Sequence, residues 1–172
     1  MAQFGKESVE SFLDAVAEET PAPGGGTSAG VAAALAAALV EMAALIADSS
    51  DAAARAAELR GRALMLAEEE LTSYAPVLDA RTVADRATAL DAASEPPAQI
   101  AELAADVAEL GVEVAGSASE AVRGDALTGV TLAEAAAAAA ARLVAINVGS
   151  GPVFERAEAA AGRAANARRR CT

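Results

Sequence analysis

The stretch from Ala29 to Ala47 most constrains how this chain can fold. It is apolar almost throughout, and its one charged residue is Glu41. A helix that is apolar on nearly every side must be buried in a protein core or in a membrane. Alanine contributes little to membrane insertion, and a charged Glu41 near the inner half would cost about 2–3 kcal/mol. We therefore predict a buried core helix over residues 27–47 and no membrane association.

The segment before this helix is Thr20-Pro-Ala-Pro-Gly-Gly-Gly-Thr-Ser28. Its prolines fix an extended entry, and its glycines leave no side chain between the backbone and an approaching group. We expect Thr27 or Ser28 to cap the helix. Because a helix N-terminus carries unpaired N–H groups and partial positive charge, this loop is a candidate seat for an anionic ligand. The residues predicted to bind ligand there are Pro23, Gly24, Gly25, Gly26 and Thr27. The alternative is a connection kept thin for close helix packing.

The rest of the chain is also predicted to be helical. Aromatic residues make up 2% of the sequence, and strand-forming residues never alternate with polar ones. Further helices are expected over Ser8–Glu19, over Asp51–Ala80, from Ser94 onward, over Thr131–Val148 and after Gly149, with Ser50 as a cap, Arg81–Asp91 as a frayed extension or connection, and a break at Arg123–Asp125. The predicted fold class is all-α: an orthogonal or antiparallel bundle of five to six helices with two long apolar central helices, in a single domain over residues 1–172.

Composition excludes several classes of function. A net charge of −12 argues against nucleic-acid binding, which needs a basic surface. With no histidine and one cysteine, Cys171, we expect no metal site and no histidine-activated nucleophile. No signal peptide is evident, so a cytoplasmic location is predicted. Each alanine buries little area, and we therefore expect a homodimer interface to supply further burial.

Glu70 interrupts an otherwise apolar pattern. The stripe at steps of three and four residues comprises Leu59, Ala63, Leu66, Tyr74 and Val77, and Glu70 falls in its gap. A carboxylate at this position is either a functional group or a residue at the core boundary with only its stem covered. Glu41 is similarly open to two interpretations, as an interior acid or as a residue facing a cleft or subunit boundary.

The order of these features resembles a known family. Phe12-Leu13, then Thr20-Pro-Ala-Pro-Gly-Gly-Gly26, then Ala-Ala-Leu-Val-Glu-Met42 are similar to the opening of the cyclodeaminase/cyclohydrolase family. That family includes the C-terminal domain of formiminotransferase-cyclodeaminase and the stand-alone methenyltetrahydrofolate cyclohydrolases. The resemblance is strongest over residues 8–47 and collinear to about Asn147. It implies a folate one-carbon enzyme with a tetrahydrofolate derivative as substrate and no bound cofactor.

The resemblance also implies catalytic residues. The family carries an acidic pair ahead of an aromatic residue on its third helix, and Glu68 and Glu70 ahead of Tyr74 occupy those places. At the break before the fifth helix, Asp125 offers a second acidic group. Asn147 is expected to bind ligand, unless it satisfies nearby backbone groups. In a cyclohydrolase, water adds to a cationic amidinium carbon, which requires a placed water and a carboxylate to take its proton.

Two departures from the family pattern separate the functional hypotheses. Gly129 stands where an aspartate is usual, and Asp48-Ser-Ser-Asp51 replaces a lysine-rich segment, leaving Lys6 as the chain's one lysine. The glutamyl carboxylate of folate would have to bind the glycine amides or an arginine such as Arg55. A cyclohydrolase is favoured over a cyclodeaminase, which commonly comes fused to a transferase domain. The alternatives are a non-catalytic member that binds a small anionic ligand and a purely structural helical interaction module.

Overall fold

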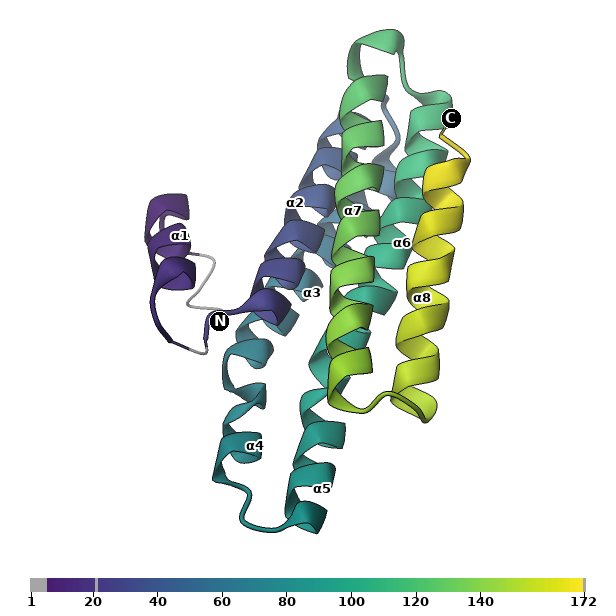
Figure 1. The fold of residues 1–172 in the computed structure, drawn as a ribbon. Coiled ribbons are helices and arrows are strands. Elements are labelled where there is room, and N and C mark those ends of the chain that lie inside the picture. Colours follow the sequence, from purple (N-terminus) through teal and green to yellow (C-terminus); the bar gives the residue numbers. More distant parts are fainter. Residues whose placement is uncertain (1–5, 21, 172) are drawn as a thin grey trace.

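The protein is an all-α bundle in the computed structural model, which describes residues 6–20 and 22–171 (Figure 1). The helices are α1 (Val9–Ala17), α2 (Gly25–Ile46), α3 (Ser50–Ser73), α4 (Ala75–Asp79), α5 (Val83–Ala93), α6 (Glu95–Ser117), α7 (Glu120–Asn147) and α8 (Pro152–Arg169). The five long ones, α2, α3, α6, α7 and α8, run alongside one another, whereas α4 and α5 extend the bundle at one end. The predicted fold class is confirmed.

Small residues let the central helix approach its neighbours closely. Helix α2 packs against α3, α6 and α7, and most of its buried residues are alanine or glycine. A Cβ at Gly30 would lie 2.8 Å from the Cβ of Ala67 on α3, and one at Gly129 on α7 would lie 3.0 Å from the carbonyl oxygen of Ala36. Both distances are too short for a side chain, so these glycines set the spacing of α2 from its neighbours.

Helices α2 and α7 are both long and apolar enough to cross a membrane by length and composition. In the bundle they are the two central apolar helices, as the sequence predicts. The other helices bury 50% of the most apolar window of α2 and 44% of that of α7. This partial burial on several sides is the pattern of helices that form the core of a bundle.

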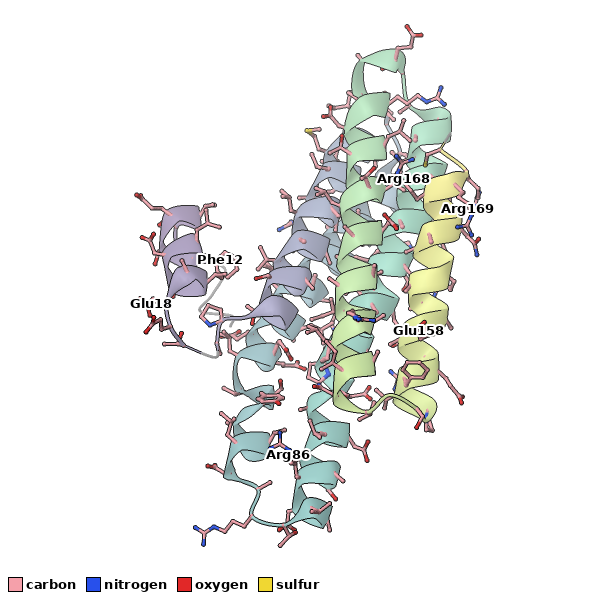
Figure 2. The ribbon with its side chains drawn as sticks, in the orientation of Figure 1. Phe12, Glu18, Arg86, Glu158, Arg168 and Arg169 are labelled. Atoms are coloured by element: carbon pink, nitrogen blue, oxygen red, sulfur yellow. The ribbon has the colours of Figure 1, made fainter. Side chains whose placement is uncertain are left out.

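The helix predicted over Asp51–Ala80 is two helices. It ends at Ser73, and α4 begins at Ala75. Pro76 explains the interruption, because proline has no N–H to donate and its ring clashes with the carbonyl one turn earlier. The next segment is ordered helix rather than a frayed extension: the Thr82 hydroxyl caps α5 by accepting from the amide of Asp85 at 3.1 Å. Arg86 of α5 donates to the carbonyl of Val77 on α4 (Figure 2).

The break predicted at Arg123–Asp125 is wrong, because α7 runs through it without interruption. Gly124 is exposed and a side chain there would meet nothing, so the helix tolerates it. Thr131, where the sequence predicts the start of a helix, lies inside α7. Its hydroxyl instead donates to the carbonyl of Leu127 at 3.0 Å, the bond that a threonine makes inside a helix.

Three predicted caps also differ from the structure. Gly24 occupies the N-cap of α2 with no side-chain cap, while Thr27 is buried in the first turn and the Ser28 hydroxyl donates to the Gly24 carbonyl at 2.8 Å. Ser49, not Ser50, precedes α3. Ser94 precedes α6 as predicted, but its hydroxyl donates back to the Leu90 carbonyl at 2.7 Å. By contrast, the Ser8 hydroxyl does cap α1, accepting from the amide of Ser11 at 3.0 Å.

Candidate functional site

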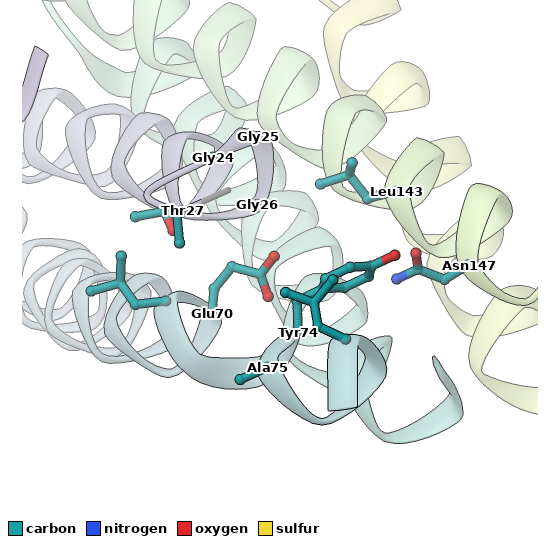
Figure 3. Close-up of a pocket in the computed structure, with 12 residues that line it drawn as sticks. Gly24, Gly25, Gly26, Thr27, Glu70, Tyr74, Ala75, Leu143 and Asn147 are labelled. Atoms are coloured by element: carbon teal, nitrogen blue, oxygen red, sulfur yellow. The ribbon is translucent and has the colours of Figure 1, made fainter. Parts of the chain in front are cut away.

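A pocket of about 370 Å³ opens beside the N-terminus of α2 (Figure 3). It is lined by Ala22, Gly24, Gly25, Gly26, Thr27, Glu70, Leu71, Tyr74, Ala75, Leu78, Leu143 and Asn147. These residues come from the segment before α2, from the first turn of α2, from the end of α3 and α4, and from the end of α7. The volume lies in the range of small-molecule sites, which are mostly apolar with a few placed polar groups.

The carboxyl group of Glu70 lies directly against the glycine turn. A Cβ at Gly26 would fall 1.9 Å from Oε1 of Glu70 and 2.4 Å from its Cδ. Position 26 therefore needs glycine, because the Glu70 carboxyl occupies the space that a side chain there would fill. The prediction that the glycine loop and Glu70 belong to one site agrees with this arrangement. Gly30, one turn later and outside the loop, instead lies against Ala67 and serves helix packing.

Burial raises the pKa of the Glu70 carboxyl above its ordinary value. The hydroxyl of Ser73, one turn along α3, donates to Oε2 of Glu70 at 2.8 Å and acts in the opposite direction. No lysine or arginine is among the described residues that line the pocket. Partial burial without a cationic partner moves the pKa of a carboxyl toward neutral pH. Such a pKa suits a group that both takes and returns a proton.

Tyr74 and Asn147 form the opposite side of the pocket. Figure 3 shows the Tyr74 ring beyond Glu70, with its hydroxyl directed toward the amide of Asn147. Tyr74 is the C-cap of α3 with near-helical dihedral angles (φ −88°, ψ −12°), and it follows Glu70 by four residues, so both side chains lie on the same side of the helix. Leu71, Leu78 and Leu143 supply an apolar wall. A flat ligand entering between the glycine turn and Tyr74 would meet the Glu70 carboxyl.

The structure brings together some of the predicted site residues but not all. Gly24, Gly25, Gly26, Thr27, Glu70 and Asn147 line the pocket. Pro23 is partly buried beside two lining residues without lining the pocket itself. Glu68 is two positions from Glu70 on α3, about 200° around the helix axis, and does not line the pocket. Asp125 lies on α7, 18 residues or about 27 Å along the helix from Leu143, and is also apart from it.

Other charged candidates also lie away from the pocket. Arg55 is 15 residues before Glu70 on α3, about 22 Å along the helix, and does not line the pocket. Glu41 accepts from Nε of Arg60 at 2.7 Å, joining α2 to α3 in the middle of the bundle. Asp48-Ser-Ser-Asp51, where the family pattern has lysines, joins the other end of α2 to α3. Neither this segment nor Gly129 is among the residues that line the pocket.

Ser73 and the leucines of the wall are site residues that the sequence analysis missed. For Ser73 a signal was available: it follows Glu70 by three positions, a spacing at which helical side chains meet. The leucines carry no such signal, because an apolar residue that lines a pocket has the same pattern as one in a core. No cluster of three or more acidic or cysteine side chains suited to a metal occurs in the described parts of the chain.

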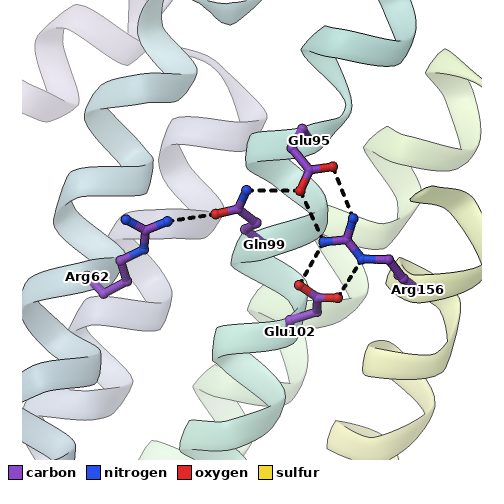
Figure 4. A network of polar contacts seen from close by, with 5 residues as sticks. All are labelled: Arg62, Glu95, Gln99, Glu102 and Arg156. Atoms are coloured by element: carbon purple, nitrogen blue, oxygen red, sulfur yellow. Dashed lines mark hydrogen bonds and ion pairs between the residues drawn. The ribbon is translucent and has the colours of Figure 1, made fainter. Parts of the chain in front are cut away.

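Several other carboxylates in the described part of the chain form ion pairs with arginine. Arg156 of α8 donates to Glu95 and Glu102 of α6 at 2.8–3.1 Å, and Gln99 extends this network to Arg62 of α3 (Figure 4). Along the same two helices, Arg163 donates to Glu109 and Asp106. The arginine partners lower the pKa values of Glu95 and Glu109. Glu70 differs from this group in having a neutral hydroxyl as its partner.

The sequence of residues 8–165 matches the family model described as formiminotransferase-cyclodeaminase. The chain belongs to the formiminotransferase-cyclodeaminase family. This confirms the family that the glycine loop and its flanks resemble. No curated protein matches the sequence significantly.

A solved structure of the same family shares this fold. The formiminotetrahydrofolate cyclodeaminase of Thermotoga maritima superimposes with a TM-score of 0.90, at 22% sequence identity, covering 97% of this chain and 94% of the other. At that identity the likeness establishes the fold of the bundle. The choice between activities within the family depends on the chemistry of the pocket.

Proposed function

We propose that the protein is a folate one-carbon enzyme, and that it acts as a methenyltetrahydrofolate cyclohydrolase, converting the 5,10-methenyl to the 10-formyl form. The observation that carries this proposal is the carboxyl of Glu70, held between the glycine turn and Tyr74 without a cationic partner among the described lining residues. Family membership supplies the substrate class. The substrate is a tetrahydrofolate derivative, and no further cofactor is required.

Glu70 would act first as a base and then as an acid. The amidinium carbon of the substrate is cationic, so an ionised carboxylate beside it stabilises the bound state and orients a water molecule. Glu70 takes a proton from that water as its oxygen bonds to the carbon. Glu70 then returns the proton to ring nitrogen N5 as the carbon–N5 bond breaks, while the new hydroxyl loses its proton to solvent and becomes the formyl oxygen. The raised pKa of Glu70 favours the second step.

The glycine turn and the apolar wall would position the substrate. Unpaired N–H groups at the start of α2 are suited to an anionic or carbonyl oxygen of the ligand. Tyr74 offers its ring face to a flat heterocycle, and Asn147 offers an amide for hydrogen bonding. We also propose a cytoplasmic homodimer that binds neither nucleic acid nor membrane, in keeping with the net charge of −12.

The test is the loss of the near-ultraviolet absorbance of methenyl-tetrahydrofolate, measured against buffer at the same pH. Acceleration by the purified protein supports the cyclohydrolase. A cyclodeaminase would instead raise that absorbance when given formimino-tetrahydrofolate, with release of ammonia. Folate binding without either reaction would identify a non-catalytic member, and absence of folate binding would leave only a helical module.

A further inference from the structure

The hydroxyl of Ser73 has two acceptors within reach, and both belong to Glu70. Its Oγ lies 2.8 Å from Oε2 of the Glu70 side chain and 3.1 Å from the backbone carbonyl oxygen of Glu70. A serine hydroxyl carries one proton, so it can donate fully to one of these oxygens at a time. The charge of the carboxyl decides between them, because a hydrogen bond to an ionised acceptor is roughly twice as strong as one to a neutral acceptor.

The end of α3 is what makes the second acceptor available. Inside a helix, the carbonyl of Glu70 would accept from the amide of the residue four positions later, which is Tyr74. Tyr74 is the C-cap, and its amide bonds to the carbonyl of Thr72 instead. The Glu70 carbonyl is thus one of those that a helix end leaves without the usual partner. A hydroxyl at position 73 can turn to this carbonyl whenever the side-chain carboxyl becomes neutral.

The other oxygen of the Glu70 carboxyl, Oε1, is available to a ligand. No residue in the described part of the chain donates a hydrogen bond to Oε1, which lies against Gly26. Every buried side-chain oxygen or nitrogen in that part of the chain has a partner, so Oε1 must be accessible to water. Figure 3 shows the carboxyl directed between the glycine turn and Tyr74, into the space that a ligand would enter.

We propose that Ser73 is a positioning residue that gives the two Glu70 oxygens different tasks: it holds Oε2 and leaves Oε1 to take the proton from water and return it to ring nitrogen N5. The path of the proton rests on the proposed function. While Glu70 is ionised, the hydroxyl donates to Oε2 and fixes the carboxylate. Once Oε1 is protonated, the hydroxyl turns to the backbone carbonyl, so neither charge state leaves it without an acceptor.

The first experiment compares the loss of a hydroxyl at two neighbouring positions. Ser73→Ala removes the bond to Glu70, whereas the matched control Thr72→Ala removes an exposed hydroxyl that donates to the Glu69 carbonyl at 3.4 Å. In methenyl-tetrahydrofolate hydrolysis, Ser73→Ala should lower kcat about tenfold and keep KM within about twofold, since a misplaced catalytic group costs rate rather than binding. Thr72→Ala should change neither. Ser73→Thr should recover most of kcat, because a helical threonine can direct its hydroxyl at a carbonyl three or four positions earlier.

The pH profile separates positioning from a general loss of stability. Burial raises the pKa of Glu70 and the Ser73 hydroxyl lowers it. Of the other titratable side chains nearby, Tyr74 lines the pocket, and Glu68 and Glu69 precede Glu70 on α3. A base must be ionised to act, so kcat/KM rises as pH rises through its pKa. Ser73→Ala removes a bond to the ionised form and should move this limb to higher pH, whereas a loss of stability alone would not move it.

The pKa of Glu70 can also be measured without turnover, by nuclear magnetic resonance of its ¹³C-labelled carboxyl carbon, assigned by its absence in Glu70→Gln. Ser73→Ala should raise that pKa, and Thr72→Ala should leave it as it is. If the wild-type protein lacks folate activity but the pKa moves in this way, the proposed function fails while the hold of Ser73 on Oε2 stands. An unchanged pKa in Ser73→Ala, an unchanged kcat in an active protein, or equal effects of the two deletions would overturn the proposal.

Discussion

Two faces of the bundle handle carboxylates in opposite ways. On the α6–α8 face, Glu95, Glu102 and Glu109 lie near the surface and each accepts hydrogen bonds from an arginine. At the pocket, Glu70 lies partly buried against a glycine turn, and a neutral serine hydroxyl donates to it. Arginine lowers the pKa values of Glu95 and Glu109, whereas burial raises the pKa of Glu70. The comparison teaches that one bundle can hold some carboxylates in ion pairs at its surface and another in a partly buried site whose raised pKa suits proton transfer.

The largest expected effect comes from removing the pocket carboxyl. Glu70→Gln keeps the shape of the side chain and can still accept from Ser73, but it cannot take a proton. Methenyl-tetrahydrofolate hydrolysis should fall at least 100-fold, the usual contribution of general acid–base catalysis. Glu102→Gln on the α6–α8 face is the comparison variant and should retain activity within about twofold. An active protein whose rate is unchanged in Glu70→Gln would remove Glu70 from the mechanism.

The next effect tests the position of that carboxyl rather than its chemistry. Gly26→Ala would place a methyl group 1.9 Å from Oε1 of Glu70, so the carboxyl must leave its place. We expect a loss of activity of about tenfold or more, since misplacing a catalytic group by about 1 Å can cost about 100-fold. Gly61→Ala is the control in the body of α3, where a side chain would meet nothing. It should raise stability by about 0.5–1 kcal/mol and leave turnover as it is. Equal turnover in the two variants would contradict the geometry.

The pH dependence of stability should differ in sign between the two faces. The raised pKa of Glu70 means that the folded state holds its proton more tightly, so ionisation opposes folding as pH rises above about 4.5. Glu70→Gln should therefore be more stable than wild type at neutral pH and equal to it in acid. The lowered pKa of Glu109 gives the reverse: its contribution is present above about 4.5 and is lost as pH falls through the folded pKa. Thermal melts of Glu70→Gln and Glu109→Gln from pH 3 to 8 test both signs, and a common sign would refute the contrast.

The smallest effect concerns the arginine pairs themselves. Arg163 and Glu109 are 43% and 35% exposed, so solvent screens their attraction. A double-mutant cycle with Arg163→Gln and Glu109→Gln should give a coupling free energy of about 1 kcal/mol or less. High salt should reduce that coupling further. A coupling of several kcal/mol, unchanged by salt, would show that this face is more deeply desolvated than its exposure indicates.

The sequence predicts the helices well because their signals are local. The apolar face of α2, the two prolines that open α6 and the serine cap of α1 each act within a few residues. The errors occur where a local signal has two outcomes. Gly124 and Thr131 suggest a break, but an exposed glycine and a threonine bonded one turn back are also compatible with continuous helix. That choice depends on the burial of α7 along its whole length.

The candidate site, like the helices, is predictable where its residues carry a local signal in the sequence. A glycine turn at a helix start and a carboxylate interrupting an apolar stripe both mark unusual positions in the sequence, and the structure brings them together. The family spacing predicts Glu68 and Asp125 beside them. Helix geometry carries Glu68 to another side of α3 and Asp125 several turns away along α7. Spacing along a helix indicates the direction in which each side chain points. Which side chains meet in one pocket depends on how the helices pack.

The arginines of α8 have a consequence for how the helices are aligned. Alanine side chains form shallow ridges, so packing alone distinguishes poorly between positions of α8 along the axis of α6. Arg156 and Arg163 are seven residues apart, as are Glu95 and Glu102, and Glu102 and Glu109. Arg156 bonds to Glu95 and Glu102, and Arg163 bonds to Asp106 and Glu109, so each guanidinium joins two carboxylates at different heights along α6. Sliding α8 in either direction would part each guanidinium from one of its two carboxylates. Weak surface charges thus favour the observed alignment of helices whose smooth sides would accept several.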